Sequence, residues 1–578
     1  MCYNVNMQFY KNSTAIALVI LFFMGFIMLL SIREDSVTTD EAPHITAGYS
    51  YLKLQDFRLN PEHPPLIKDF AAIPLLFLDL NFPRDHPAWT SMVNAQWDLA
   101  PQFLYRSGND PDKIIFWGRM SPILITLLFG WFVFKWTREL YGAKLALFAL
   151  TLFAFSPTIL AHGRLVTTDV PAAAAFFISI YYFIKLLKNP SKQNLIIAGV
   201  VFAIAQLTKF SLVLLVGFLP MITFLWIVIH RSDLCSYTGL TCVLRQIWFW
   251  KLRFLAIFAI TALIILPVYQ FHIANYPPEK QIQDIQHILS NNTKFPALTN
   301  ALVWMSDKPV LRAYAQYMLG VSMVFMRVAG GNTTYFLGEV SNQAWWYYFP
   351  IAFFLKVPMA LLIFITLSII LWLKNILKFN LNFVRENFDA IAMLLFVIFY
   401  WTISITGNLN IGVRHVLPTF PFIYLLITGQ IKRWTSHAKM IFVSAVLAFY
   451  IISSITTYPH FIAYFNEFAG GPDGGARYIV DSNLDWGQDL RRLKKFVEKN
   501  NIDKIKVDYF GGGDVKYYLG DRAEIWHADN GETTGWLAVS ATFLQTSRAY
   551  PWASYEWLDK YVPVEKIGYS IFIYNIEK

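Results

Sequence analysis

The sequence predicts a polytopic α-helical membrane protein with a small α/β domain at its C-terminal end. Three observations support this fold class. Of the 578 residues, 56% are hydrophobic and only 15% are charged, whereas soluble proteins carry about 25% charged residues. Apolar runs of about twenty residues, long enough to cross a bilayer, recur through residues 1–457. Residues 458–578 instead alternate short polar and apolar stretches, as a soluble domain does.

About eleven apolar stretches are long enough to be interpreted as membrane spans. They occupy residues 14–32, 114–134, 145–161, 169–187, 194–208, 210–229, 253–272, 348–373, 389–406, 413–430 and 440–457. No small-residue cleavage site follows the first stretch, which indicates a retained anchor helix rather than a signal peptide. An odd number of spans would place the two termini on opposite sides of the membrane.

The distribution of Lys and Arg between the short loops predicts the orientation of the chain. One side holds 17 of these residues, and the other holds only Arg164, Lys209 and Arg414. Because cytoplasmic loops carry the excess of positive charge, the first side is expected to be cytoplasmic, with the N-terminus. Segments 33–113 and 273–347 and the C-terminal region would then lie outside. The net charge of +10 would reflect orientation and not nucleic-acid binding.

The sequence divides into two expected domains, a transmembrane domain over 1–457 and an extracytoplasmic α/β domain over 458–578. Within the second, alternating and amphipathic patterns predict local elements. These are strands over 476–480, 504–510 and 569–576 and a helix over 488–500.

Two adjacent carboxylates, Asp40 and Glu41, follow the first span. A partly desolvated carboxylate at the lipid boundary gains basicity and becomes a useful proton acceptor. The pair also fits a purely structural role, because acidic residues are favoured in the first turn of a helix. Both residues are therefore candidate catalytic groups, with a helix start as the alternative interpretation.

Histidines accompany other polar groups in the outer loops. His63 begins the segment 63–68, whose prolines either hold the imidazole at a site or only shape a turn. His162 and Asp169 flank a short loop between two spans, where ionisable groups indicate function. Asp169 also fits a helix start followed by a proline. We predict Asp169 as a catalytic residue and His63, His162 and His415 as substrate-binding residues.

The three outer cations, Arg164, Lys209 and Arg414, each need a negative partner. One such partner is a phosphate at the outer leaflet, which Arg grips through paired donors. The alternative is a structural salt bridge to one of the acidic residues. We predict all three as ligands of a donor phosphate.

Carboxylates for proton abstraction beside cations for phosphate suit a transferase that uses a lipid-linked phosphosugar. The acceptor hydroxyl would lose its proton to Asp40 and attack the anomeric carbon while the lipid phosphate departs. Because phosphate is a weakly basic leaving group, it needs cationic stabilisation more than a general acid.

These motifs resemble those of the polytopic GT-C glycosyltransferases, especially the protein O-mannosyltransferases and the aminoarabinose transferases of lipid A. The resemblance rests on Asp40-Glu41 in the first outer loop, on His63-Pro64-Pro65-Leu66 followed by Lys68, and on Thr168-Asp169 in the second outer loop. It is clearest over residues 30–210. The segment 482–489 is also similar to bacterial members described as phospholipid-carrier-dependent glycosyltransferases.

The resemblance implies a GT-C fold and an inverting transfer of a hexose or pentose from a polyprenyl-phosphate donor, with Asp40 as the base. Glu41 and Asp169 would orient base and acceptor, Lys209 and Arg414 would hold phosphate, and no metal or other cofactor would be required. The expected partners are the lipid-linked donor, membrane lipids and an acceptor protein or glycolipid. The expected location is a bacterial inner membrane, with the C-terminal domain in the periplasm.

A lipid or solute transporter of the cell-envelope glycan pathway is the main alternative function. Carriers place their binding groups near mid-bilayer on broken helices, and many contain internal repeats. The sequence has no apparent repeat, and its unusual ionisable residues gather at one face. A noncatalytic partner of a glycan machine is disfavoured because the acidic pair Asp40-Glu41 is present.

Overall fold

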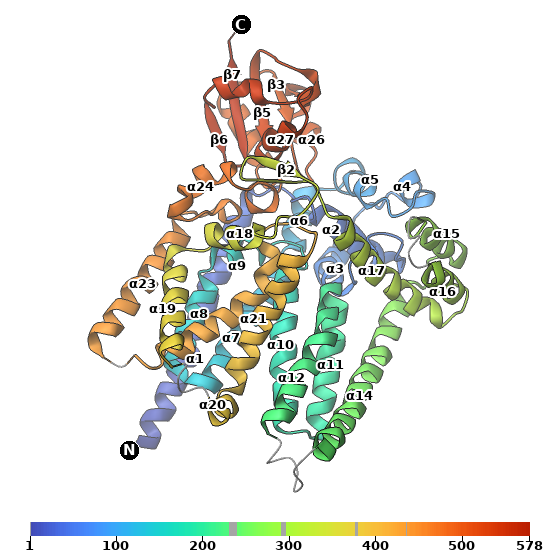
Figure 1. Cartoon of the computed structure of the whole chain (residues 1–578). Helices are drawn as coiled ribbons and strands as arrows, with labels where there is room; N and C mark the ends of the chain where they lie inside the picture. The colour runs from blue at the N-terminus through green and yellow to red at the C-terminus, as the bar shows by residue number, and fades with distance from the viewer. Residues whose placement is uncertain (1, 231–239, 291–295, 376–379, 435, 578) are drawn as a thin grey trace.

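The computed structural model describes residues 2–577 except 231–239, 291–295, 376–379 and 435. Long helices form a bundle, and a β-sheet lies at one end of it (Figure 1). The N-terminus lies at the opposite end of the bundle from the sheet and the C-terminus. The prediction that the two termini lie on opposite sides of a membrane stays a prediction.

The bundle is made of apolar helices of very different length. They are α1 (Cys2–Ser31), α7 (Met120–Tyr141), α8 (Ala143–Ala154), α10 (Asp169–Lys188), α11 (Lys192–Thr208), α12 (Leu214–Ile229), α14 (Leu240–His272), α18 (Tyr348–Lys356), α19 (Met359–Asn375), α21 (Phe388–Thr406), α22 (Phe420–Ile431) and α23 (His437–Ile455). Their apolar surfaces and number make the chain an integral multi-pass membrane protein.

Seven helical stretches of the described chain are long and apolar enough to cross a membrane. They are Asn12–Glu34, Pro111–Tyr141, Asp169–Lys188, Phe210–Ile229, Thr241–His272, Phe388–Thr406 and His437–Ile455. The pair α18 and α19 makes an eighth if it counts as one span, although the two helices are bent by 116°. The predicted count of about eleven is therefore not confirmed.

The difference arises because an apolar run is not always one continuous helix. The predicted span 145–161 breaks after α8, where Ser156 accepts a hydrogen bond from the Ile159 amide and starts the short helix α9 (Pro157–His162). The predicted span 413–430 begins with a 3₁₀ helix, Val413–Thr419. Hydropathy measures apolar length, and it does not reveal such interruptions.

The other helices lie at the sheet end of the bundle or beside it, except Leu381–Glu386, which lies at the end opposite the sheet (Figure 1). They are α2 (Glu41–Leu54), α3 (Leu66–Ala72), α4 (Pro87–Thr90), α5 (Gln96–Pro101), α6 (Pro111–Gly118), α15 (Pro278–Ile288), α16 (Pro296–Ser306), α17 (Leu311–Gly330) and α20 (Leu381–Glu386). Nearly every residue of α2 is buried, so this helix is a core element of the sheet end.

The C-terminal region contains a five-stranded mixed sheet in the order β4-β3-β5-β7-β6. Its strands are β3 (Ile505–Asp508), β4 (Ala523–Ile525), β5 (Gly535–Ser540), β6 (Glu565–Ile567) and β7 (Ile571–Ile576), with helices α24 (Gly471–Gly474), α25 (Leu490–Lys499), α26 (Val515–Leu519) and α27 (Ala541–Thr546). β3 is parallel to β4 and β5, and β7 is antiparallel to β5 and β6. A separate hairpin joins β1 (Thr334–Phe336) to β2 (Glu339–Ser341).

The sheet and the bundle share one hydrophobic core. Along β5, Leu537 and Val539 join the large cluster that runs through the bundle, whereas Ala538 faces a second cluster with α2 and α25. This alternation is what a strand imposes on its side chains. Packing of one sheet face onto the bundle places the C-terminal region directly over the ends of the membrane helices.

The predicted elements of the C-terminal region are correct in three of four places. A helix and two strands form where the sequence predicts them, as α25, β3 and β7. The predicted strand 476–480 is wrong, because only Ile479 pairs, in a single bridge to Phe336. The backbone turns sharply at Asp481, whose φ is +56°, and this turn prevents a strand from extending.

Candidate active site

Two acidic residues that are far apart in the sequence meet at one arginine. Asp40 immediately precedes α2, and Asp169 is the first residue of α10. Neither side chain caps its own helix. Instead, Arg414 donates from Nη1 to Asp40 Oδ2 at 2.9 Å and to Asp169 Oδ2 at 3.3 Å. Both positions are thus helix starts, and both side chains are directed to a shared cation.

Lys209 completes the charged cluster. It follows α11, and its Nζ donates to Asp169 Oδ1 at 2.7 Å. Two cations therefore balance two carboxylates. The Asp169 side chain is only 3% exposed, whereas that of Asp40 is 31% exposed. Asp40 is the acid that an incoming substrate can reach most easily.

Arg414 carries a stable positive charge in this setting. Burial opposes ionisation, but Asp40, Asp169 and Asp481 together hold the pKa of Arg414 above its ordinary value. The guanidinium therefore stays charged at every physiological pH. A phosphate could bind it only in competition with, or beside, the two carboxylates.

Residues of the C-terminal region contact Arg414 in the cluster. Arg414 Nε donates to Ser482 Oγ at 3.0 Å, and its guanidinium lies 4.2 Å from the ring centroid of Trp486. Asp481 is a third carboxyl in the neighbourhood, and burial raises its pKa to about 6. The segment 482–489 was predicted only to resemble bacterial glycosyltransferases, so these contacts with Arg414 were not predicted.

Glu41 does not join this cluster. It is fully buried, and its two oxygens accept from Arg119 Nε at 2.8 Å and Nη2 at 2.6 Å. The amides of Thr38 and Val166 also donate to it. Although burial opposes ionisation, these partners hold the pKa of Glu41 below its usual range. One feature of the sequence could have predicted this pair: Arg119 is a charged residue inside the predicted span 114–134, where it needs a negative partner.

Arg164 also lies outside the cluster. Its side chain is 1% exposed and pairs with Asp35 through Nη1 at 2.8 Å. Asp35 in turn pairs with Arg492 of α25 at 2.8 Å, and Arg492 pairs with Asp489. The structure thus brings Lys209 and Arg414 to the acidic cluster and places Arg164 in a buried network that joins the bundle to the C-terminal region.

His63 packs against a second histidine near the cluster. The rings of His63 and His44 meet edge to face at 5.0 Å, and His44 Nδ1 lies 2.9 Å from the Val166 carbonyl oxygen. Burial holds the pKa of His63 well below its ordinary value, so this ring is neutral. Lys68 fixes the preceding turn by donating to the carbonyl oxygens of Asn60 and His63, both at 2.9 Å.

The other two predicted histidines lie near the cluster, each beside an aromatic ring. His162 packs edge-on against Trp486 with a centroid distance of 5.6 Å, and burial lowers its pKa to about 3. His415 stacks on Phe349 at 5.1 Å, and burial lowers its pKa to about 4. Both rings are neutral at physiological pH, so they could bind a sugar hydroxyl but would not add charge for a phosphate.

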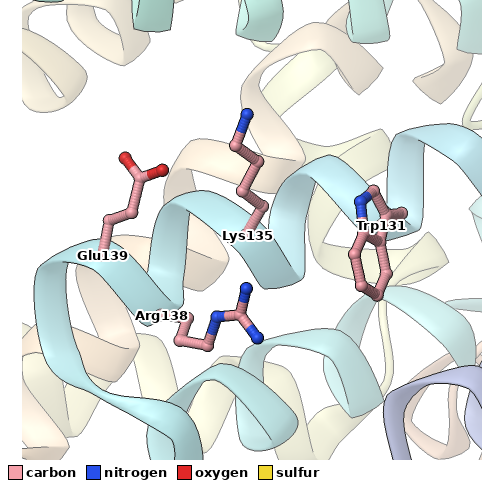
Figure 2. A pocket seen from close by; sticks show the side chains of 4 residues that line it. All are labelled: Trp131, Lys135, Arg138 and Glu139. Atoms are coloured by element: carbon pink, nitrogen blue, oxygen red, sulfur yellow. The ribbon is translucent and has the colours of Figure 1, made fainter. Parts of the chain in front are cut away.

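A surface pocket lies elsewhere, far along α7 from Arg119. It is lined by Trp131, Lys135, Arg138 and Glu139 (Figure 2). A helix rises about 1.5 Å per residue, so Lys135 stands more than about 20 Å from the start of α7. The pocket is therefore separate from the acidic cluster, and its side chains belong to the predicted cytoplasmic side.

Within the described residues, no group of three or more His, Cys, Asp or Glu side chains is arranged to hold a metal ion. The expectation that catalysis needs no metal or other cofactor stays a prediction.

Several solved structures align with most of the chain at low identity. ArnT from Cupriavidus metallidurans bound to undecaprenyl phosphate aligns over 98% of this chain and 97% of its own, at 11% identity and a TM-score of 0.46. The apo state of the same protein aligns over 98% of both chains, at 12% identity and a TM-score of 0.42. An oligosaccharyltransferase from Archaeoglobus fulgidus in complex with zinc and sulfate aligns over 90% of this chain and 68% of its own, at 12% identity and a TM-score of 0.42.

Sequence comparison finds a similarity over part of the chain. No curated protein matches the sequence. Residues 113–250, however, match the sequence model of the dolichyl-phosphate-mannose-protein mannosyltransferase family. The matched segment includes Asp169 and Lys209, two residues of the charged cluster. The match confirms the predicted resemblance to the protein O-mannosyltransferases over this segment.

Proposed function

We propose that the protein is an inverting glycosyltransferase that moves one monosaccharide from a polyprenyl-phosphate donor to an acceptor hydroxyl or phosphate at the outer membrane face. The observation that carries the proposal is the shared contact of Asp40 and Asp169 with Arg414. It supports the proposal because it brings the acid proposed as the base next to the cation proposed to bind the phosphate.

In the reaction, Asp40 takes the proton of the acceptor hydroxyl. The acceptor oxygen forms a bond to the anomeric carbon while the bond from that carbon to the phosphate oxygen breaks. The electron pair of the broken bond leaves with the polyprenyl phosphate. Because the acceptor attacks the face opposite the departing phosphate, the configuration at the anomeric carbon inverts. Arg414 and Lys209 stabilise the negative charge that develops on the departing phosphate.

Exposure and pairing favour Asp40 over the other two acids as the base. Its side chain is 31% exposed, whereas Asp169 is 3% exposed and Glu41 is fully buried. Asp169 contacts both cations, so we assign it to holding Lys209 and Arg414 in place. Glu41 is occupied by Arg119, and we assign it a structural role.

His63, His162 and His415 remain candidate substrate-binding residues, because all three surround the cluster as neutral rings. Neutral imidazoles offer one donor and one acceptor each, which suits sugar hydroxyls. Arg164 is assigned to the buried network with Asp35, and the donor phosphate is assigned to Arg414 and Lys209.

The direct test uses purified protein in detergent with radiolabelled polyprenyl-phosphate monosaccharides. Dolichyl-phosphate mannose comes first, because the matching family is described by this donor. Candidate acceptors are outer-face proteins and glycolipids from cells that lack the protein. The wild type should transfer label to one acceptor, and the Asp40→Asn variant should not.

Transport of a lipid or solute without chemical change is the result that would contradict the proposal. If the protein moved a lipid or solute across liposomes without any chemical change, and Asp40→Asn moved it equally well, the transporter alternative would be correct. Transfer of label by the wild type excludes that outcome for the same preparation.

A further inference from the structure

The segment from Asp481 to Trp486 contacts Arg414 on two sides. Ser482 Oγ accepts a hydrogen bond from Arg414 Nε at 3.0 Å. The Trp486 ring lies against the face of the guanidinium, 4.2 Å from its carbon. Trp486 and Ser482 are each 1% exposed, so neither contact is a surface encounter. One edge and one face of the guanidinium are thus fixed, and Nη1 is left to reach the carboxylates.

The same segment also holds the backbones that carry the base and the cation. The Trp486 carbonyl oxygen accepts from the amide of Thr39, next to Asp40, at 3.0 Å. Asn483 Oδ1 accepts from the amide of Val413 at 3.0 Å. Ser482 Oγ itself donates to the Ile411 carbonyl oxygen at 3.0 Å. The backbone next to Asp40 and the backbone next to Arg414 are therefore both hydrogen-bonded to the segment from Asp481 to Trp486.

The approach of this segment to the Arg414 loop requires a glycine. Gly412 has a φ of +98°, and a Cβ at this position would lie 2.8 Å from Ser482 Oγ. A side chain would strain the backbone and push Ser482 away from the guanidinium. The position of Ser482 relative to Arg414 therefore depends on the glycine at position 412 as well as on Ser482 itself.

We propose that Ser482 and Trp486 are positioning residues of the reaction centre, which aim Arg414 at the donor phosphate. This inference rests on the proposed function. A hydroxyl and an aromatic face are both neutral, so they orient the guanidinium without neutralising it. A carboxylate in their place would compete with phosphate. Fixing a flexible arginine before the donor arrives also removes an ordering cost from binding.

The proposal gives the C-terminal region a role in the chemistry. It contributes two side chains that hold the phosphate-binding cation, in addition to any part it plays in recognising the acceptor. The site would be incomplete without residues that lie more than 440 positions after Asp40 in the sequence.

The test measures binding of farnesyl phosphate, a short polyprenyl phosphate, to the full-length protein in detergent by calorimetry. The variants are Ser482→Ala and Trp486→Phe, each alone and combined with Arg414→Lys, and the single variants Arg414→Lys and Arg414→Gln. Ser547→Ala is the matched control, because Ser547 is a buried serine of the same region whose hydroxyl bonds to local backbone only. Binding of inorganic phosphate is measured in parallel to separate recognition of the phosphate from that of the prenyl chain.

We expect Ser482→Ala to raise the Kd for farnesyl phosphate about tenfold, because it removes a hydrogen bond to a charged group. Trp486→Phe should raise it by a smaller factor, and Ser547→Ala should leave it unchanged. In the Arg414→Lys background, Ser482→Ala should have little further effect, because lysine lacks the Nε donor. A purely structural role would lower the unfolding temperature in both backgrounds alike.

Two results would overturn the proposal, and they differ. If Arg414→Lys weakens binding but Ser482→Ala and Trp486→Phe do not, the positioning role is wrong while the proposed function stands. If Arg414→Lys and Arg414→Gln both leave the Kd unchanged in folded protein, Arg414 does not bind the donor phosphate, and the proposed function fails with it.

Discussion

Asp40 and Arg414 form an ion pair at 2.9 Å across 374 positions of sequence. The cation assigned to phosphate is thus engaged by the carboxylate assigned to proton abstraction. A phosphate that binds Arg414 would compete with Asp40 for the guanidinium. Donor binding and release of the base are therefore coupled through one side chain, and this coupling gives the first prediction.

Asp40→Asn should abolish transfer while leaving affinity for a polyprenyl phosphate equal to or higher than that of the wild type. The amide cannot accept a proton, yet it no longer holds Arg414 by charge. Since the Asp40 side chain is 31% exposed, the unfolding temperature should change little. Activity and farnesyl phosphate binding are measured on one preparation. Normal turnover by the variant would show that another group is the base.

Glu41→Gln, unlike Asp40→Asn, should cause a large loss of stability. The Glu41 and Arg119 side chains are 0% and 1% exposed, and removing one partner leaves a buried, uncompensated charge. The expected cost is about 3–5 kcal/mol of unfolding free energy. Thermal unfolding in detergent measures it, with the neighbouring Asp40→Asn variant as the matched control. A Glu41→Gln protein of wild-type stability without activity would instead return Glu41 to the catalytic residues.

The contrast between these neighbours explains what the sequence could and could not predict. The pattern of two acids after the first span indicates both a helix start and a reactive site. The helix start is confirmed by α2, and the reactive site stays a prediction. Which acid stays partly exposed depends on how the two acids pair with Arg119 and Arg414, which are distant in sequence. Pairing of that kind is set by tertiary packing, and local pattern does not encode it.

The three outer cations allow a similar comparison. Their position against the positive-inside pattern correctly indicates that each has an anionic partner. For Arg164 the partner is a buried structural acid, Asp35, whereas Lys209 and Arg414 meet the carboxylates of the site. The role of Trp486 was beyond sequence reasoning for another reason. Its segment has no regular pattern, and its contacts depend on how the C-terminal sheet docks onto the bundle.

Arg164→Gln should therefore lower stability and leave donor affinity almost unchanged in the protein that remains folded. Its guanidinium is 1% exposed and lies beside Asp35, so a neutral residue leaves the Asp35 charge less well compensated. Arg414→Gln is the comparison variant and should raise the Kd for farnesyl phosphate at least tenfold, by loss of a charge-assisted contact. Equal loss of binding in both variants would place Arg164 at the phosphate after all.

Acid should destabilise the folded protein through His162. The pKa of this buried ring is about 3 in the folded protein and 6.5 in the unfolded chain. Between these values the unfolded chain binds a proton that the folded protein does not, so stability falls as pH decreases from about 6.5. The contribution by pH 4 is about 3 kcal/mol. Unfolding temperatures of the wild type and His162→Phe at pH 7 and pH 4 measure it. An identical pH dependence in both proteins would contradict the assignment.

The orientation of the chain can be tested from the two ends of α10. This helix starts at Asp169 in the site and ends at Lys188, and twenty residues of helix span about 30 Å, the thickness of the hydrocarbon core. Trp552, which is 79% exposed in the C-terminal region, and Lys192, which is exposed just beyond α10, should then lie on opposite sides of the membrane. In a variant without native cysteines, Trp552→Cys should react with an impermeant maleimide in intact spheroplasts, and Lys192→Cys should react only after lysis. The reverse pattern would place the acidic cluster on the cytoplasmic face and would require a donor presented from that side.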